Sequence, residues 1–182
     1  MTKTYPEKIL KFCPRCSGRF IPQHDFSFIC ETCGLHFFSN ACAAVCALIL
    51  DSKGRLLITK RAKEPKKGML DLPGGFVDPL ESIENALRRE VKEELGVDVT
   101  DMRYFCSYPN RYVYSGLTYF TIDLAFICRL ENISTIKPAD DVKDAFFMSA
   151  GKINLEEIAF ESIRNIISCY IDLNHRNTAD RP

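Results

Sequence analysis

The fold of this chain is decided by residues 75–97, which read GFVDPLESIENALRREVKEELGV. A helical apolar period begins at Ile83, and Gly96 follows at the position where a left-handed residue often ends a helix. Asp78, which imitates the start of a capping box, competes with Ser82 for the N-cap. Because the apolar period begins directly after Ser82, the sequence favours a helix over residues 82–95.

This helix carries Glu90, Glu93 and Glu94. At about 100° per residue, Glu90 and Glu94 fall inside the apolar arc and Glu93 lies at its edge. A solvated face is the ordinary interpretation of an acidic run, but uncompensated buried carboxylates are costly. Spacings of three and four residues bring the carboxylates together, and hard oxygen donors suit Mg²⁺ or Mn²⁺. Glu81 is placed to bind Arg89 or a second ion. We therefore predict a divalent-cation site rather than a structural salt-bridge cluster.

The segment resembles the Nudix box, a 23-residue pattern, because Gly75 is followed by five residues, Glu81, seven residues and then Arg89 to Val97. More loosely, the resemblance extends over roughly residues 41–172. It implies an α/β protein with a Nudix-like α/β/α sandwich around a mixed sheet. It also implies hydrolysis of a nucleoside diphosphate linked to another moiety, with release of a nucleoside monophosphate.

The resemblance also implies roles for individual residues. The catalytic Mg²⁺ or Mn²⁺ would be bound by Glu90, Glu93 and Glu94, with the Gly75 carbonyl as a further ligand and Arg89 orienting a carboxylate. The general base is open between Glu90 and the pair Asp140 and Asp141, of which Asp141 is the preferred catalytic candidate. A plain surface turn is the competing interpretation of the two aspartates.

Two Cys-x-x-Cys pairs precede this region, Cys13–Cys16 and Cys30–Cys33, separated by 13 residues. Four thiolates so spaced can enclose one structural Zn²⁺, and a closed set leaves no open position for catalysis. Disulfides are the alternative, but the reducing environment expected for an intracellular protein disfavours them. We predict a zinc ribbon over residues 1–40 and the hydrolase domain over residues 41–182. The other five cysteines lie in apolar stretches and are expected to be buried: Cys42, Cys46, Cys106, Cys128 and Cys169.

A zinc ribbon ahead of a Nudix domain resembles the NADH pyrophosphatase branch, which has a Ser-Gln-Pro-Trp-Pro-Phe-Pro motif after the box. Residues 106–114 read CSYPNRYVY here, so a serine, a proline and an aromatic are kept but the tryptophan is missing. The expected substrate is NADH, NAD or ADP-ribose. Aromatic rings can stack on the adenine or nicotinamide ring of such a substrate, and a guanidinium group can bind its phosphate. The substrate-binding candidates, several of them around a Pro-Asn turn, are Gly74, Tyr108, Arg111, Tyr112 and Tyr114.

The composition is that of a soluble globular protein, with 46% apolar and 26% charged residues and no net charge. The start does not resemble a signal peptide, and the longest apolar run, 41–50, is half the length that spans a membrane. We expect a cytoplasmic protein without membrane contact. Zero net charge does not favour nucleic acid as a partner. Residues 1–20 nevertheless hold five basic and one acidic side chain, which is compatible with NAD-capped RNA as a substrate.

A competing hypothesis is a zinc-ribbon module that binds nucleic acid or protein, with a Nudix domain that only senses nucleotides. Homodimers are common among proteins that this chain resembles, and a homodimer is a possible state of this protein.

Period and turn signals complete the fold prediction. Strands are expected over 43–50, 55–60, 103–108, 118–130 and 142–148, and a last helix from Asn154 to about Leu173.

Overall fold

The computed structural model describes residues 6–24 and 26–179. The chain divides into two compact units, of which the first takes residues 1–42 and Arg111–Thr121 and the second takes Ala43–Asn110 and the residues from Ile122 onward. The first unit therefore draws on two separate stretches of chain. The domain boundary between residues 40 and 41 stays a prediction.

The helices are α1 (Pro6–Ile9), α2 (Ile83–Leu95) and α3 (Glu161–Ala179), with short 3₁₀ turns at Ile133–Thr135, Ala150–Lys152 and Leu155–Glu157. The strands are β1 (Phe20–His24), β2 (Ser27–Cys30), β3 (His36–Phe38), β4 (Cys42–Ile49), β5 (Leu56–Arg61), β6 (Leu70–Asp71), β7 (Gly74–Phe76), β8 (Val99–Tyr114), β9 (Leu117–Leu130) and β10 (Val142–Met148). Among the described residues, no helix is both long and apolar enough to cross a membrane.

The ribbon in the first unit is a three-stranded antiparallel sheet in the order β1-β2-β3. Its small core consists of Cys13, Phe20, Phe28 and Cys30. A core of this size stabilises a fold weakly, because so little apolar surface leaves the water. The ribbon therefore needs a further source of stability.

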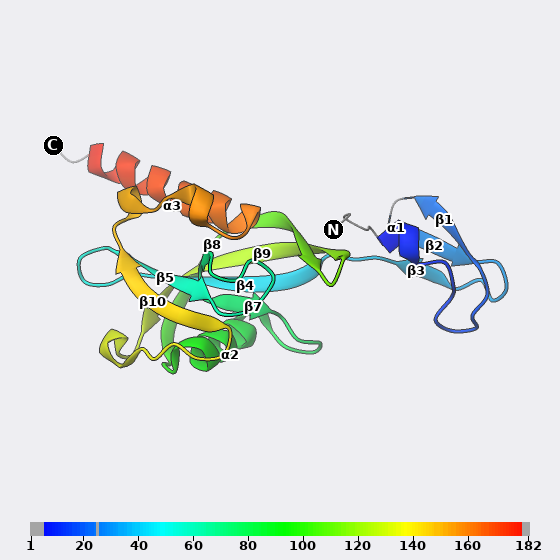
Figure 1. Ribbon diagram of the computed structural model, residues 1–182, viewed down its shortest axis with the longest axis horizontal. Helices are drawn as coiled ribbons and strands as arrows, with labels where there is room; N and C mark the ends of the chain where they lie inside the picture. Colours follow the sequence, from blue (N-terminus) through cyan, green and yellow to red (C-terminus); the bar gives the residue numbers. More distant parts are fainter. Residues whose placement is uncertain (1–5, 25, 180–182) are drawn as a thin grey trace. The chain divides into compact units, whose positions relative to one another are not determined.

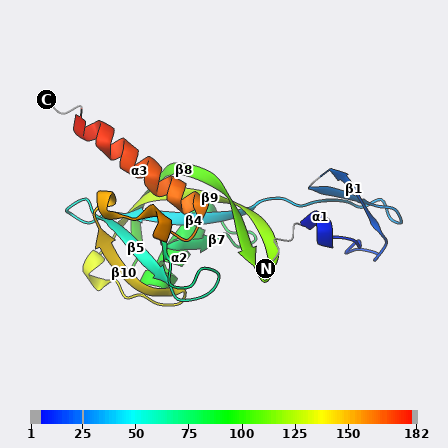
Figure 2. The ribbon, with the colours of Figure 1, turned by 45° about the horizontal axis from the view of Figure 1, so that its top comes forward.

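The larger unit contains two sheets, in the orders β7-β4-β9-β8 and β10-β5-β6. Helices α2 and α3 lie on opposite sides of these strands, as Figure 1 shows and the turned view of Figure 2 confirms. The predicted α/β sandwich is therefore confirmed.

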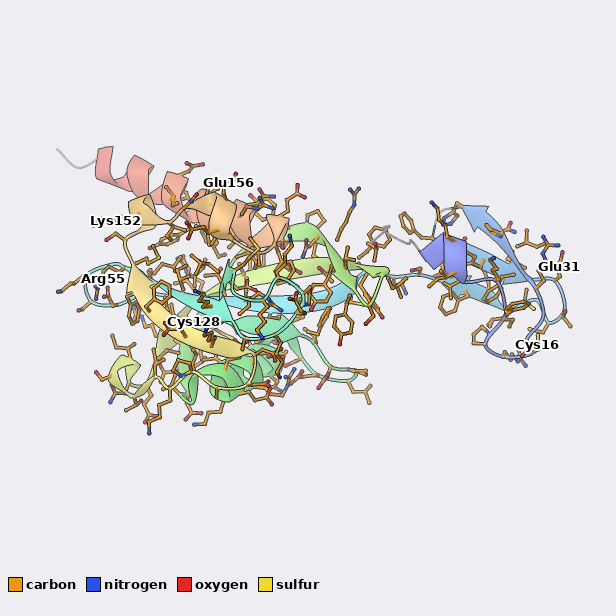
Figure 3. The ribbon with its side chains drawn as sticks, in the orientation of Figure 1. Cys16, Glu31, Arg55, Cys128, Lys152 and Glu156 are labelled. Atoms are coloured by element: carbon orange, nitrogen blue, oxygen red, sulfur yellow. The ribbon has the colours of Figure 1, made fainter. Side chains whose placement is uncertain are left out.

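Two hydrophobic cores result from alternation along β4, because successive side chains of a strand point to opposite faces. Cys46 and Leu48 join the core under α3, which includes Ile166 and Ile167. Residues 45, 47 and 49 join the core under α2, together with Cys128, which is labelled in Figure 3. Both faces of β4 are thus buried, which explains its nearly continuous apolar sequence.

The structure corrects three details of the sequence prediction. Asn154 caps only a 3₁₀ turn, because its side chain accepts from the Glu156 N–H, and the last helix begins later and extends further than predicted. No turn occurs at Pro109-Asn110, since β8 continues to Tyr114 and the hairpin turns at residues 115 and 116, both with positive φ. Of the five cysteines predicted to be buried, Cys46 and Cys128 are buried, Cys106 and Cys169 are only partly buried, and Cys42 is exposed.

Candidate active site

Helix α2 presents its acidic residues at different depths. Ser82 caps the helix by accepting from the Asn85 N–H at 3.3 Å, and Gly96 ends it in the left-handed conformation, as predicted. Glu94 lies on the buried side and is only 6% exposed. The Glu90 side chain is 15% exposed and that of Glu93 is 47% exposed, so the three carboxylates run from the interior to the solvent.

The turn before α2 brings backbone directly against these carboxylates. Gly74 and Gly75 pair with Cys46 and Val45 of β4, and the Gly74 N–H donates to Glu94 Oε2 at 2.9 Å. A Cβ on Gly75 would lie 2.6 Å from the Glu90 carboxyl carbon. The absence of a side chain at residue 75 therefore makes room for the Glu90 carboxylate.

Arg89 holds the outer carboxylates together. Its Nε and Nη2 donate to the two oxygens of Glu81 at 3.0 and 2.9 Å, a bidentate arrangement. Its Nη1 donates to Glu90 at 2.7 Å and to Glu93 at 3.2 Å. Glu81, predicted to bind Arg89 or a second ion, is paired with the guanidinium in the structure.

The electrostatics of the cluster differ from residue to residue. Hydrogen bonds from Arg89 lower the pKa of Glu81. Burial raises the pKa of Glu90, which Arg89 opposes, and burial raises the pKa of Glu94 still more. One guanidinium cannot compensate four carboxylates, and among the described ion pairs Arg89 has none with Glu94. The set of inward oxygen donors fits a hard divalent cation such as Mg²⁺ or Mn²⁺.

The loop before β10 brings the predicted aspartates to the same region. Backbone N–H groups of Lys137 and Ala139 donate to the last carbonyls of α2, those of Leu95 and Glu94, at 2.9 Å each. Asp140 and Asp141 both pair with Lys63, at 2.8 and 2.5 Å. Burial is the main cause of the raised pKa of Glu94, and the charge of Asp141 adds to it.

A buried ion pair that the sequence analysis did not single out lies directly before the glycine turn. Arg61 Nη1 donates to Asp71 Oδ2 at 2.9 Å, and the guanidinium lies over the Phe160 ring at 5.0 Å from its centroid. Burial raises the pKa of Asp71 to about 6, while Arg61 opposes this shift. An aspartate inside the apolar run Leu70 to Leu72 was the available signal, because such a position requires a partner.

The substrate-binding candidates are divided between the two units. Gly74 lies in the glycine turn, while Tyr108 lines a groove of about 440 Å³ with α3 residues that include Asn165, Cys169 and Asp172. Arg111, Tyr112 and Tyr114 belong to the first unit, where the two tyrosine rings stack with centroids 6.4 Å apart.

The four cysteines of the ribbon form a separate candidate metal centre. The Sγ atoms of Cys13, Cys16, Cys30 and Cys33 all lie within 4.8 Å of one another. The Cys13–Cys33 and Cys16–Cys30 sulfur distances are 3.7 and 3.5 Å, close to the ~3.8 Å edge of a tetrahedron with Zn–S bonds of about 2.3 Å. Hydrogen bonds from the Cys33 and Thr32 N–H groups lower the pKa of the Cys30 thiol to about 6, which favours the thiolate.

Fold and site together define an α/β sandwich whose glycine turn and helix gather carboxylates. The NUDIX domain model matches residues 41–168, so the chain belongs to the Nudix family. Its relatives include a protein of Vibrio atlanticus named NAD-capped RNA hydrolase NudC, which is 34% identical over 118 residues. The aligned region covers 64% of this chain and 43% of that protein. A Pseudomonas aeruginosa protein of the same name is 25% identical over 162 residues, covering 88% and 55% of the two chains.

The chain thus spans about half the length of the curated relatives it matches. Among solved structures, a NUDIX hydrolase from Nitrosomonas europaea superposes with a TM-score of 0.62 at 23% identity and covers 91% of this chain and 93% of its own. At this identity the likeness supports the fold. The match over most of both chains agrees with the predicted Nudix-like sandwich.

Proposed function

We propose that this protein hydrolyses the pyrophosphate bond of a nucleoside diphosphate linked to another moiety, with NADH, NAD or ADP-ribose as the leading substrates. The observation that carries this proposal is the inward pair Glu90 and Glu94, held against Gly74 and Gly75. Among the described ion pairs, Arg89 compensates Glu90 and no cation pairs with Glu94. The names of the NudC relatives support a substrate that contains NAD.

Glu90, Glu93 and Glu94 would hold Mg²⁺ or Mn²⁺, with the Gly75 carbonyl as a further ligand. When bound, such a cation stabilises charge on the diphosphate oxygens and acidifies a water molecule. Arg89 orients Glu90 and Glu93 through its hydrogen bonds, and the Gly74 N–H fixes the rotamer of Glu94. These contacts preorganise the donors, which reduces the cost of assembling the site.

The proton acceptor is proposed to be Glu90 or one of the loop aspartates, with Asp141 as the preferred aspartate. Both candidates suit the role by position, because Glu90 lies at the glycine turn and Asp141 is electrostatically linked to Glu94. If Asp141 is the base, Asp141→Asn removes the acidic limb of the kcat profile. If Glu90 is the base, that limb persists in Asp141→Asn.

For the group beyond the diphosphate, we propose Gly74, Tyr108, Arg111, Tyr112 and Tyr114 as contacts. The aromatic rings offer stacking surfaces for a base or a nicotinamide, and Arg111 offers a cation for a phosphate. NAD-capped RNA would present the same linkage on a longer molecule, as the name of the relatives suggests.

The decisive experiment measures phosphate release after phosphatase treatment with NADH, NAD, ADP-ribose, diadenosine polyphosphates, nucleotide sugars and oxidised dNTPs, each with Mg²⁺ or Mn²⁺. Glu94→Gln and Glu93→Gln should each lower kcat by at least about a hundredfold, the scale expected when a group that stabilises developing charge is lost. Glu84→Gln, in the exposed first turn of the same helix, is the matched control and should keep wild-type activity. Wild-type rates of hydrolysis in a folded Glu93/Glu94 double variant would contradict the mechanism.

A further inference from the structure

The ribbon sheet has one buried and one exposed face. Phe20, Phe28 and Phe37 point inward, with ring centroids 5.8 to 6.5 Å apart. On the opposite face, strand register aligns Ile21 with Ile29 of β2, and Ile29 with His36 of β3. These three side chains therefore form a row across all three strands.

Aromatic side chains extend this row at two corners. The Phe38 ring lies beside His36, with centroids 4.2 Å apart, and is 51% exposed. Phe12 is 69% exposed and faces Arg19 across an antiparallel bridge. Arg19 and Ile21 are two positions apart in extended chain, so their side chains share one face. We call Phe12, Arg19, Ile21, Ile29, His36 and Phe38 together the ribbon face.

This exposure is unusual for so small a fold. Two phenylalanines at 51% and 69% exposure, with Ile21 at 41%, remain in water although the apolar core of the described ribbon has only four buried residues. Exposed apolar groups gathered on one face, as opposed to scattered ones, indicate an interaction surface.

The charge around the ribbon face indicates the kind of partner. Residues 1–40 hold five basic and three acidic side chains, although the whole chain has no net charge. Lys8, Lys11, Arg15 and Arg19 are exposed, and within the described ribbon none of these cations takes part in an ion pair. Glu31, labelled on the ribbon in Figure 3, is an exposed acidic side chain there.

Flat rings next to unpaired cations match the chemistry of a single-stranded nucleic acid. Bases stack on aromatic side chains with little dependence on sequence, while cations contact the phosphates. A duplex hides its base faces and offers no such stacking. We propose that the ribbon face binds a single-stranded nucleic acid through stacking on Phe12, His36 and Phe38, assisted by Arg19.

This proposal goes beyond the proposed hydrolysis and does not depend on it, because the face contains none of the carboxylates of the candidate active site. The test measures fluorescence anisotropy of a labelled oligonucleotide of roughly 12 nucleotides, within the site size of small single-strand-binding folds. It uses the full zinc-loaded chain without Mg²⁺ or Mn²⁺, so that the oligonucleotide is not hydrolysed. RNA, DNA and duplex forms of one sequence are compared.

Phe12→Ala and Phe38→Ala should each weaken single-strand binding roughly fivefold or more, the loss expected for one stacked base. Arg19→Gln, which removes no apolar side chain, should reduce the salt slope by about 0.7. Leu173→Ala is the matched control, since that leucine is 41% exposed on α3 in the other unit. Zinc content and circular dichroism show whether each variant keeps its fold.

Equal binding by the wild-type protein and all three ribbon variants would overturn the proposal, as would a preference for the duplex. Concentration-dependent self-association that Phe38→Ala abolishes would also overturn it, because the face would then be a contact between copies. Glu94→Gln should bind the oligonucleotide normally, and loss of its NAD hydrolysis tests the proposed function alone.

Discussion

The two adjacent glycines of the turn before α2 have different tasks. Gly74 has φ +144°, and a Cβ there would lie 2.0 Å from the Val45 carbonyl oxygen. A Cβ on Gly75 would meet the end of the flexible Glu90 side chain instead. Residue 74 is therefore constrained by backbone, and residue 75 by the candidate active site.

Alanine substitutions should separate these two tasks. Gly74→Ala should lower the free energy of unfolding by at least about 2 kcal/mol, because both the conformation and the contact are unfavourable. Gly75→Ala should stay folded but lose activity on the order of a hundredfold, because displaced carboxylates no longer hold the reacting geometry. Urea unfolding and steady-state kinetics measure the two effects, and equal stability losses in both variants would contradict this assignment.

Asp71 should give the protein a distinct pH dependence. Its folded-state pKa of about 6 lies above the ordinary 3.8, so the folded state binds the proton more tightly than the unfolded state. The resulting stabilisation is complete below about pH 4 and is lost as the pH rises through 6, a change of about 3 kcal/mol. Compared with Asp71→Asn, the wild-type free energy of unfolding should fall between pH 4 and 6. Parallel pH profiles of the two proteins would refute this origin.

At the scale of elements, α2 positions the candidate active site and depends on its N-cap. Ser82→Ala removes the acceptor of the Asn85 N–H and should cost about 1 kcal/mol of unfolding free energy. Thermal and urea denaturation measure this loss. Ser82→Asp keeps an acceptor and should retain most of the stability, whereas equal losses in both variants would show that the cap contributes nothing.

The sequence predicted this helix closely because its signals are local. Ser82, Gly96 and the apolar period are all encoded within the helix and its ends, and the inward placement of Glu94 follows from the same period. The end of β8 was predicted incorrectly because Pro109 and Asn110 are typical turn residues, yet pairing with β9 keeps them in a strand. Tertiary pairing of this kind leaves no local signal.

Contacts between distant segments could not be predicted either. The Arg61–Asp71 pair depends on the loop that separates β5 from β6, and the position of Asp141 depends on hydrogen bonds from its loop to the end of α2. The Arg89–Glu81 pair was among the predictions, although its bidentate geometry required the path of the turn between them. The sequence thus predicted which carboxylates gather and named Arg89 as their cation, while the pairing of Arg61 with Asp71 required the structure.

At the scale of the whole molecule, the two units should differ in what stabilises them. The larger unit has two extensive cores, whereas half of the fully buried residues in the ribbon core are cysteines. Binding of Zn²⁺ supplies much of the folding free energy in small metal-binding folds. The ribbon should therefore unfold when zinc is removed, and the larger unit should not.

Hydrogen exchange with and without a zinc chelator tests this expectation. Protection of amides in β1 and β2 should disappear without zinc and return when zinc is restored, while β4 and α3 should stay protected. Cys30→Ser should mimic the chelator, and Cys42→Ser, which changes an exposed cysteine outside the cluster, is the matched control. Unchanged protection of β1 in zinc-free protein would show that another interaction stabilises the ribbon.

The hairpin tip Arg111–Thr121, which groups with the ribbon, has a consequence for how such proteins are assembled by gene fusion. Phe26 of the ribbon meets Phe120 of this tip edge-on, with ring centroids 5.2 Å apart. A fused N-terminal segment brings only one side of that contact. The transferable module is therefore a ribbon together with a compatible hairpin, and insertions or deletions in the hairpin require matching changes on the ribbon surface.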